Sequence, residues 1–407
     1  MISEAETIAS VVLTEFDRLP PKRKPQVRDN GTREWVPLSG IVARHGNGSF
    51  ECLVLATGMK CLPTSKLSSA NGTVLHDWHA EVLAMRVLNH FILQECKALA
   101  EGKDSAYVRW KTTDEPGTQP FAWREQVALH MYCSEAPCGD ASMELTMSAQ
   151  DDASPWEAPL PPHLMDKVDG GSPELALLGR ACFSQLGVVR RKPARADAPS
   201  TLSKSCSDKI ALRQCTSLLG SLGSLLVSPR GVYLTSLVLP ESQFSATACE
   251  RCFASQGRMA PVKGLQEGWD DGYAFRPFEV RTTALEFEYS RRWSGQQGMV
   301  KYVASNLATA WSCNGLAENI IGGVLQGRKQ SDPRGGSVVS RGKMWVLATE
   351  VARMVGMGEL AHFQGSYGEM KEGRLMAERK KVKEGVRWAA LKGWVRNTGD
   401  EAFVMSI

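Results

Sequence analysis

Hydrophobic residues recur along the chain at two different spacings, and each spacing predicts one type of secondary structure. Between Val82 and Cys96 the apolar positions follow one another at steps of three and four. That spacing predicts a helix that begins near His79 and ends at Gly102, because residues three and four apart share one helical face. Apolar and polar residues alternate across 126–133, which predicts a strand with one buried face.

The same patterns predict elements along most of the chain. Further helices are expected at 4–19, 210–226, 343–355 and 374–392, with a short one near Cys138, and further strands at 40–43, 51–56 and 232–239. Because helices alternate with strands, the expected class is α/β, with one elaborated domain at 40–407. Residues 1–39 are expected to form an N-terminal helix and a basic segment packed on or near that domain. Residues 153–203 are rich in Pro, Gly and Arg, which predicts an insertion or surface loop.

Composition narrows the class of protein. The 407 residues are 43% hydrophobic and 23% charged, which is typical of soluble globular chains. Residues 1–16 do not have the pattern of a signal peptide, and no apolar run reaches the ~18 residues of a membrane helix. The 11 cysteines are odd in number and scattered, which favours reduced thiols and a cytoplasmic or nuclear location. Formal charge is only +4, so the places where basic residues cluster matter more than their sum.

Two short segments have the pattern of a metal centre. Residues 77–81 (DWHAE) open one predicted helix, and residues 136–140 (APCGD) follow a predicted strand. An imidazole in a first helical turn, as at His79, points beyond the helix end, and free backbone N–H groups near Cys138 would stabilise a thiolate. Glu81 projects beside this site without being needed as a ligand, which is the placement of a general acid and base.

A catalytic zinc ion needs three protein ligands and one open position. In the signature H-x-E with P-C-x-x-C the third ligand follows three residues after the first cysteine, where this chain has Ala141. We therefore expect the third ligand to be Cys206, at the head of a later helix. Cys133 is an alternative, but a gap of five residues before Cys138 aims it poorly, and a core thiol is the competing interpretation.

Two other motifs carry less weight. Cys249 and Cys252 have the spacing of half a structural zinc site, but no second pair accompanies them, so two buried helical thiols are the simpler interpretation. Residues 336–343 lack the glycine spacing of a phosphate loop, and Met344 stands where that motif needs Ser or Thr.

Four blocks of sequence carry a family resemblance: LATGMKC (55–61), HDWHAEV (76–82), PCGDAS (137–142) and SCSDKIA (205–211). From about residue 40 to 403 the chain resembles the eukaryotic adenosine deaminases that act on transfer RNA, the branch that shares its deaminase domain with the double-stranded-RNA editing enzymes. The resemblance implies a cytidine-deaminase-like domain, with a central mixed sheet flanked by helices and a C-terminal helical extension. It also implies that His79, Cys138 and Cys206 bind zinc and that Glu81 moves protons while adenosine becomes inosine.

The resemblance further implies a buried inositol hexakisphosphate. The positions that match its lining are Arg86, Ser203, Lys209, Ser221, Arg341, Tyr367, Lys371, Lys383 and Trp394. Such a polyanion can be buried only among many cations and donors. Five positions depart from the editing enzymes: Met85, Leu212, Arg213, Arg396 and Asn397. A solvated basic helix face is the competing interpretation of residues 374–387.

The implied substrate is transfer RNA, with the adenosine just 3′ of the anticodon (tRNA position 37) of alanine tRNA as the target. No double-stranded-RNA-binding domain is expected before residue 40, nor an obligate protein partner. Phosphate contacts are expected from segment 22–28 and from Lys60, Arg190, Arg191, Lys192 and Arg195, although an ordinary basic surface loop explains each cluster as well. The rival functions are a deaminase of other structured RNA, of cytidine or of free nucleosides, and an inactive zinc- and RNA-binding scaffold, which would have no need of Glu81.

Overall fold

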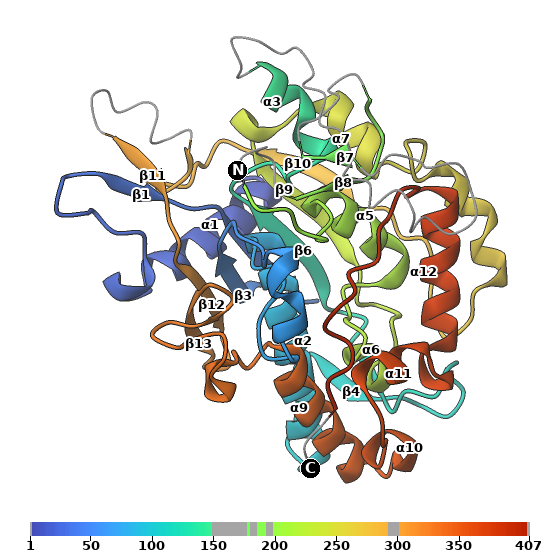
Figure 1. The fold of residues 1–407 in the computed structure, drawn as a ribbon. Helices are drawn as coiled ribbons and strands as arrows, with labels where there is room; N and C mark the ends of the chain where they lie inside the picture. Colours follow the sequence, from blue (N-terminus) through green and yellow to red (C-terminus); the bar gives the residue numbers. More distant parts are fainter. Residues whose placement is uncertain (1, 149–176, 180–184, 193–197, 292–300, 405–407) are drawn as a thin grey trace.

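An eight-stranded mixed sheet forms the centre of the molecule (Figure 1). The computed structural model describes residues 2–148, 177–179, 185–192, 198–291 and 301–404. The strand order is β10 (Glu279–Thr283), β9 (Leu234–Pro240), β6 (Ala128–Cys133), β2 (Leu38–Arg44), β3 (Phe50–Thr57), β12 (Ala308–Ser312), β13 (Ala317–Ile321) and β14 (Val324–Leu325). Strands β6, β9 and β10 run parallel to one another, and the other neighbouring pairs are antiparallel.

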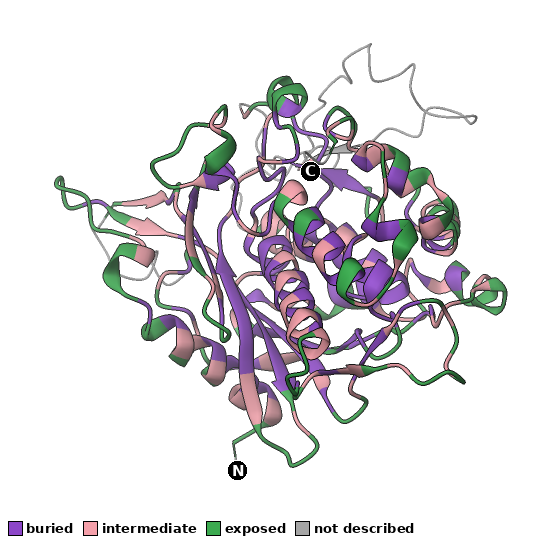
Figure 2. Cartoon of the chain, turned by 90° about the horizontal axis from the view of Figure 1, so that it is seen from below, coloured by how far each residue is buried: buried purple, intermediate pink, exposed green. Residues whose placement is uncertain are grey.

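Helices cover both faces of this sheet. Helix α2 (Ala80–Ala100) lies against β2, β3 and β12, and α1 (Glu4–Asp17) lies against β2, β3, β6 and β10. Along β2 the alternation of side chains sends Ile41 and Ala43 into the larger core with α2, and Val42 into the smaller core with α1. Figure 2 shows the sheet and the long helix beside it as mostly buried, with exposed residues at the periphery.

The remaining helices lie mainly on the α2 side and in the C-terminal third. They are α3 (Met143–Ser148), α5 (Cys206–Thr216), α6 (Gly223–Leu226), α7 (Ala246–Phe253), α9 (Arg341–Met354), α10 (Gly358–Ala361), α11 (Tyr367–Glu372) and α12 (Ala377–Ala389). Short 3-10 helices are η1 (Pro21–Arg23), η2 (Thr64–Ser69), η3 (Asp140–Ser142), η4 (Glu241–Gln243), η5 (Ala260–Gly264), η6 (Gln266–Gly268), η7 (Pro333–Gly335) and η8 (Arg374–Met376). The predicted class, a mixed sheet flanked by helices with a helical C-terminal extension, is confirmed.

Three small ribbons lie outside the central sheet. Strand β1 (Arg33–Trp35) pairs with β11 (Tyr302–Ala304), β4 (Val108–Trp110) with β5 (Phe121–Trp123), and β7 (Leu177–Leu178) with β8 (Arg190–Arg191). Within the part of the chain that the structure describes, no helix is long and apolar enough to cross a membrane.

One local prediction was wrong. The single helix expected at 210–226 is two helices, because Ser217 has a positive φ of 55° and the Leu218 N–H donates to Val232 rather than to a helical carbonyl. The short helix expected near Cys138 is present: Gly139, with φ 105°, turns the chain, η3 starts at Asp140, and α3 follows from Met143. Much of the segment 153–203 lies outside the described residues, so its assignment as an insertion or surface loop stays a prediction; within its described part, residues 189–192 and 201–203 are buried.

Candidate metal centre and the adjoining cavity

Chain segments far apart in sequence meet at one edge of the sheet. His79 is the N-cap residue of α2, and Glu81 lies in the first turn with only 6% of its surface exposed. Cys206 is the first residue of α5, which is capped by the Ser205 side chain. The Cys206 N–H points at the Cys138 sulfur over 3.3 Å, and the Cys138 carbonyl accepts from the Ser207 N–H. The loop after β6 and the start of α5 are therefore locked together.

The pKa values of the two thiols are shifted in opposite directions. A hydrogen bond from the Cys206 side chain, with the positive charges of Lys192 and His79, holds the pKa of the Cys138 thiol well below its usual range. Burial and the neighbouring Cys138 raise the pKa of the Cys206 thiol. A thiolate is the form of cysteine that binds a metal ion, so Cys138 is prepared to be a ligand. Burial and the Cys138 charge also raise the pKa of Glu81, as suits a group that both accepts and returns a proton.

Asp77 orients the imidazole of His79. Its Oδ1 atom lies 2.9 Å from His79 Nδ1 and accepts the His79 backbone N–H over 3.0 Å. Burial lowers the pKa of His79, but Cys61 and Asp77 outweigh it and raise the pKa to about 10. A carboxylate that holds one ring nitrogen leaves the other nitrogen for a metal ion, whose binding would release the proton.

A buried ammonium group joins Asp77 to the cysteines. Lys192 Nζ lies 2.9 Å from Asp77 Oδ2 and 3.1 Å from the Cys206 sulfur. Lys209 Nζ and the Ser203 hydroxyl donate to the same Asp77 oxygen. Burial alone would lower the pKa of Lys192, but Asp77 and the cysteine sulfurs raise it well above its usual value. This chain of contacts runs from Lys209, on α5, to the predicted metal ligands.

These contacts correct the predicted RNA surface. Arg190, Arg191 and Lys192 are 0%, 2% and 4% exposed, so the prediction that they contact RNA phosphates was wrong. Their backbone is paired on both sides, with β7 and with residues 203–205, which leaves no face of the run open to solvent. Arg195 lies outside the described residues, and Lys60 is half-buried beside the metal centre, where its carbonyl accepts the Trp78 N–H.

A second set of buried charges braces the two cysteine segments. Asp140 and Asp208 each follow a cysteine, Cys138 or Cys206, by two residues, and both are fully buried. Arg258 Nη1 lies 2.7 Å from Asp208 Oδ1 and 3.9 Å from Asp140 Oδ2. Arg258 therefore bonds Asp208 directly and lies within ion-pair distance of Asp140, whose Oδ1 accepts from Arg251 Nε over 3.1 Å. These contacts hold the two cysteine segments near each other.

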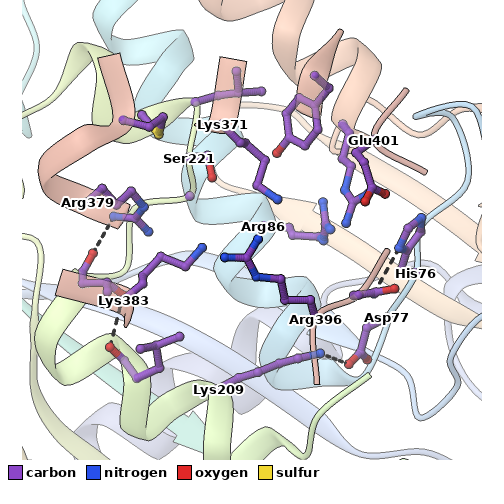
Figure 3. Close-up of a pocket in the computed structure, with 18 of the residues that line it drawn as sticks. His76, Asp77, Arg86, Lys209, Ser221, Lys371, Arg379, Lys383, Arg396 and Glu401 are labelled. Atoms are coloured by element: carbon purple, nitrogen blue, oxygen red, sulfur yellow. Dashed lines mark hydrogen bonds and ion pairs between the residues drawn. The ribbon is translucent and has the colours of Figure 1, made fainter. Parts of the chain in front are cut away.

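A cavity of about 550 Å³ adjoins this centre on its Lys209 side (Figure 3). All nine residues predicted to line an inositol hexakisphosphate site surround it: Arg86, Ser203, Lys209, Ser221, Arg341, Tyr367, Lys371, Lys383 and Trp394. The lining contains eleven basic and four acidic residues. Figure 3 shows Arg86, Lys371 and Lys383 extending into the same space from α2, α11 and α12.

The cations of this cavity repel one another. Burial and the charges of Arg387 and Arg379 hold the pKa of Lys383 well below its usual range. Burial and neighbouring arginines also lower the pKa of Arg213 to about 9. The buried Nε atoms of Arg379 and Arg387 have no hydrogen-bond partner among the described residues. Such a group of cations is stable only with an anion between them, so the lining fits a polyanionic ligand.

The prediction missed Lys204, Arg379 and Arg387, which also line the cavity. Two of them were detectable. Arg379, Lys383 and Arg387 recur every four residues in α12, so their side chains share one helical face. The alternative of a solvated basic face is wrong for this side of α12, because Arg379 is 5% exposed and bonds the carbonyls of Thr216 and Leu219.

The described residues offer one group of three metal-binding side chains whose ligand atoms lie within 4.8 Å of one another: Cys61, Asp77 and His79. Cys61 was not predicted. The Asp77 carboxylate already accepts hydrogen bonds from Lys192, Lys209 and Ser203. The two ammonium groups therefore compensate its negative charge. Cys133, Cys249 and Cys252 are buried thiols, and burial raises the pKa of each.

Comparison with known proteins agrees with this geometry. Residues 54–398 match the profile of the adenosine-deaminase (editase) domain. The tRNA-specific adenosine deaminase 1 of Schizosaccharomyces pombe is 34% identical over 402 residues, which is 97% of this chain and 95% of that protein. The protein of the same description from Saccharomyces cerevisiae is 35% identical over 240 residues, 58% of each chain. The double-stranded RNA-specific editase Adar of Drosophila melanogaster is 28% identical over 273 residues, 65% of this chain and 38% of that one.

Proposed function

The chain belongs to the adenosine-deaminase (editase) domain family and is an adenosine deaminase, and from this premise we propose that it converts adenosine to inosine in transfer RNA, with a zinc ion bound by His79, Cys138 and Cys206. The observation that carries the proposal is the buried Glu81 beside a low-pKa cysteine and an oriented histidine. One imidazole and two sulfurs are a donor set that suits zinc and leaves a fourth position open.

The residues of the chain divide the chemistry between them. Zinc, when bound there, lowers the pKa of water and so provides a nucleophile at neutral pH for attack on C6 of adenine. Glu81 accepts one proton of that water and delivers it to N1 of the base. It then takes the proton of the new C6 hydroxyl and delivers it to the amino group, which leaves as ammonia while C6 becomes the carbonyl of inosine. Its raised pKa makes the Glu81 carboxylate a stronger base and brings that pKa closer to neutral pH, where one group can both accept and return a proton. A paired or stacked adenosine must leave its stack to reach Glu81.

Glu81→Ala and Glu81→Gln test the role of the carboxylate. Both variants are expected to keep one zinc ion per chain, measured by elemental analysis, and to form no inosine from tRNA. Normal inosine formation by a pure, zinc-containing Glu81→Ala sample contradicts the assignment.

Two cysteine variants separate the proposed ligands from the neighbouring group that contains Cys61. Cys206→Ser is expected to lose most of the zinc, whereas Cys61→Ser is expected to retain it, because Cys61 lies beside the imidazole without being needed as the third ligand. If Cys61→Ser lost the zinc and Cys206→Ser retained it, the metal ligands would be Cys61, Asp77 and His79.

For the substrate, we propose adenosine 37 of alanine tRNA. The support is similarity to relatives described as tRNA-specific, the first of which aligns along nearly its whole length. A pool of unmodified tRNAs, incubated with the protein and sequenced base by base, tests this: inosine should form beside one anticodon. Free cytidine and free adenosine are tested as substrates in parallel assays. Conversion of either one, without conversion of tRNA, would favour a nucleoside deaminase. Tight tRNA binding without any deamination would favour an inactive scaffold.

For the cavity, we propose inositol hexakisphosphate as the buried ligand. The support is the excess of basic side chains and the unpaired guanidinium nitrogens around one cavity. Protein purified without added phosphate should contain about six phosphorus atoms per chain. An active preparation without phosphorus would exclude the ligand.

A further inference from the structure

The net charge of the chain is concentrated in one short segment. Residues 18–35 contain six basic side chains (Arg18, Lys22, Arg23, Lys24, Arg28 and Arg33) and two acidic ones (Asp29 and Glu34). Without this segment the totals of 48 basic and 44 acidic residues become 42 of each. The rest of the chain is therefore neutral, and residues 18–35, called the arm below, account for the whole formal charge of +4.

The arm is an ordered projection. It begins with η1 and continues as a hairpin, in which the Arg28 N–H donates to Thr32 and the Glu34 N–H donates to Gln26. Gly31, with φ 76°, makes the turn at its tip. Strand β1 then runs parallel to β11, and Figure 1 shows these two strands projecting beyond the central sheet.

Both ends of the arm are anchored next to the metal centre. At one end the Arg23 carbonyl accepts from Thr309 Oγ1 over 2.7 Å, and the Thr309 N–H donates to Thr57 Oγ1. At the other end the Pro37 carbonyl accepts the Gly58 N–H. The Gly58 carbonyl in turn accepts the Ala80 N–H over 2.9 Å, and Ala80 lies between the two residues His79 and Glu81.

Most of the cations of the arm face solvent. Lys22, Arg28 and Arg33 are exposed, as is Lys301 at the start of the neighbouring β11. Arg28 pairs with Glu34 over 3.0 Å, but its side chain is 45% exposed. An exposed ion pair of this kind contributes about 0–1 kcal/mol, so a phosphate group can compete with the carboxylate.

We propose that the arm binds the phosphodiester backbone of the RNA beside the adenosine that enters the catalytic site. The inference rests on the proposed function and adds the surface by which the substrate is held. A compact RNA whose reactive base lies at His79 and Glu81 must pass its flanking backbone over the neighbouring edge of the sheet, where the arm is rooted. Phosphates are attracted there by charge rather than by base sequence.

The test is the triple variant Lys22→Gln, Arg28→Gln and Arg33→Gln. The substitutions spare the anchors of the arm, which are backbone carbonyls of Lys22, Arg23 and Pro37. We expect KM for tRNA to rise about tenfold or more at physiological salt while kcat at saturating tRNA stays unchanged. The slope of log Kd against log salt should fall by about 2–3, since each lost phosphate contact removes about 0.7–0.9.

The control neutralises three exposed basic residues on other elements: Lys103, Lys263 and Arg353. Lys103 pairs with Glu101 as Arg28 pairs with Glu34, so the cost of losing a surface pair is matched. The single variants Lys22→Gln and Arg33→Gln should each remove about one unit of salt slope, and they replace the triple variant if its kcat falls.

Two outcomes overturn the inference: an unchanged KM and salt slope in the triple variant, or an equal loss of tRNA binding in the control variant. Failure of the proposed function is distinguishable, because the wild-type protein would then form no inosine in tRNA. Equilibrium binding of tRNA measures the role of the arm in either case.

Discussion

Two basic stretches of this chain have opposite environments. Residues 190–192 are three consecutive cations with almost no exposed surface, and they bond Asp77, the Cys206 sulfur and backbone carbonyls. The arm has twice as many basic residues, and most of its side chains are at the surface. In sequence both look like candidates for RNA phosphate contacts, but only the arm is available to a partner.

The difference shows that the neighbours of a cation determine its role. A buried cation is stable only if carboxylates, sulfurs or carbonyls replace the water around it, so the removal of one partner is expensive. An exposed cation loses little when it is removed and acts mainly through long-range attraction, which salt weakens. Substitutions in the two regions should therefore differ in size and in salt dependence.

The largest effect is expected from Lys192→Met. It leaves the buried carboxylate of Asp77 with one ammonium partner fewer and removes the contact to the Cys206 sulfur. The free energy of unfolding should fall by about 3–5 kcal/mol, and kcat should fall with it. Denaturant titration beside Arg33→Gln, which should change stability by about 0.5 kcal/mol or less, measures the contrast. Equal losses would mean that burial does not distinguish the two stretches.

Next in size is the effect of Arg258→Met on metal binding. This substitution removes the guanidinium that bonds Asp208 and lies within ion-pair distance of Asp140. The two cysteine segments should then separate more readily, and competition with a chelator should show zinc affinity lowered about 10- to 100-fold. The exposed Arg230 provides the control Arg230→Met, which should leave zinc affinity unchanged. If Arg258→Met left the zinc affinity unchanged, the contacts of Arg258 would stabilise the fold without affecting the metal site.

A smaller effect is expected where buried cations face a ligand rather than a carboxylate. Lys383 faces the cavity and Lys381, two residues away on the same helix, is exposed and pairs with Glu378. Lys383→Met should lower the phosphorus content of the purified protein and its free energy of unfolding by about 1–3 kcal/mol. Lys381→Met should change neither. Full phosphorus content in Lys383→Met would show that this ammonium does not contact the ligand.

The smallest effect concerns buried imidazoles, which resist becoming charged. Burial lowers the pKa of both His76 and His130 to about 4, from an ordinary value of 6.5. The unfolded chain therefore binds more protons between those values, and stability should fall as pH drops from about 6.5 towards 4. Each histidine should contribute about 1 kcal/mol of this loss between pH 6.5 and 5.5. Urea titrations of His130→Gln should show a shallower loss than the wild type, whereas His362→Gln, at an exposed position, should not.

Elements with a strong local pattern could be predicted from the sequence. The helix at α2, the strands β2, β3 and β6, and the early residues of α5 were all expected, because a face buried against one core imposes a regular spacing on its own residues. The break at Ser217 was not expected, because the Leu218 N–H donates to the Val232 carbonyl and no local pattern reveals that contact. Motifs likewise pointed to His79, Glu81, Cys138 and Cys206, but not to Cys61 or to the brace at Arg258.

By itself, the sequence determined which residues could carry the chemistry and which segments would be helices or strands, since both depend on residue type and short spacing. The tertiary structure alone decided which cations are buried beside Asp77, which surround the cavity and which remain on the arm. The physical reason is that the state of a charge depends on the groups that surround it, and for Lys192 those groups come from positions 77 and 206, far away in the chain.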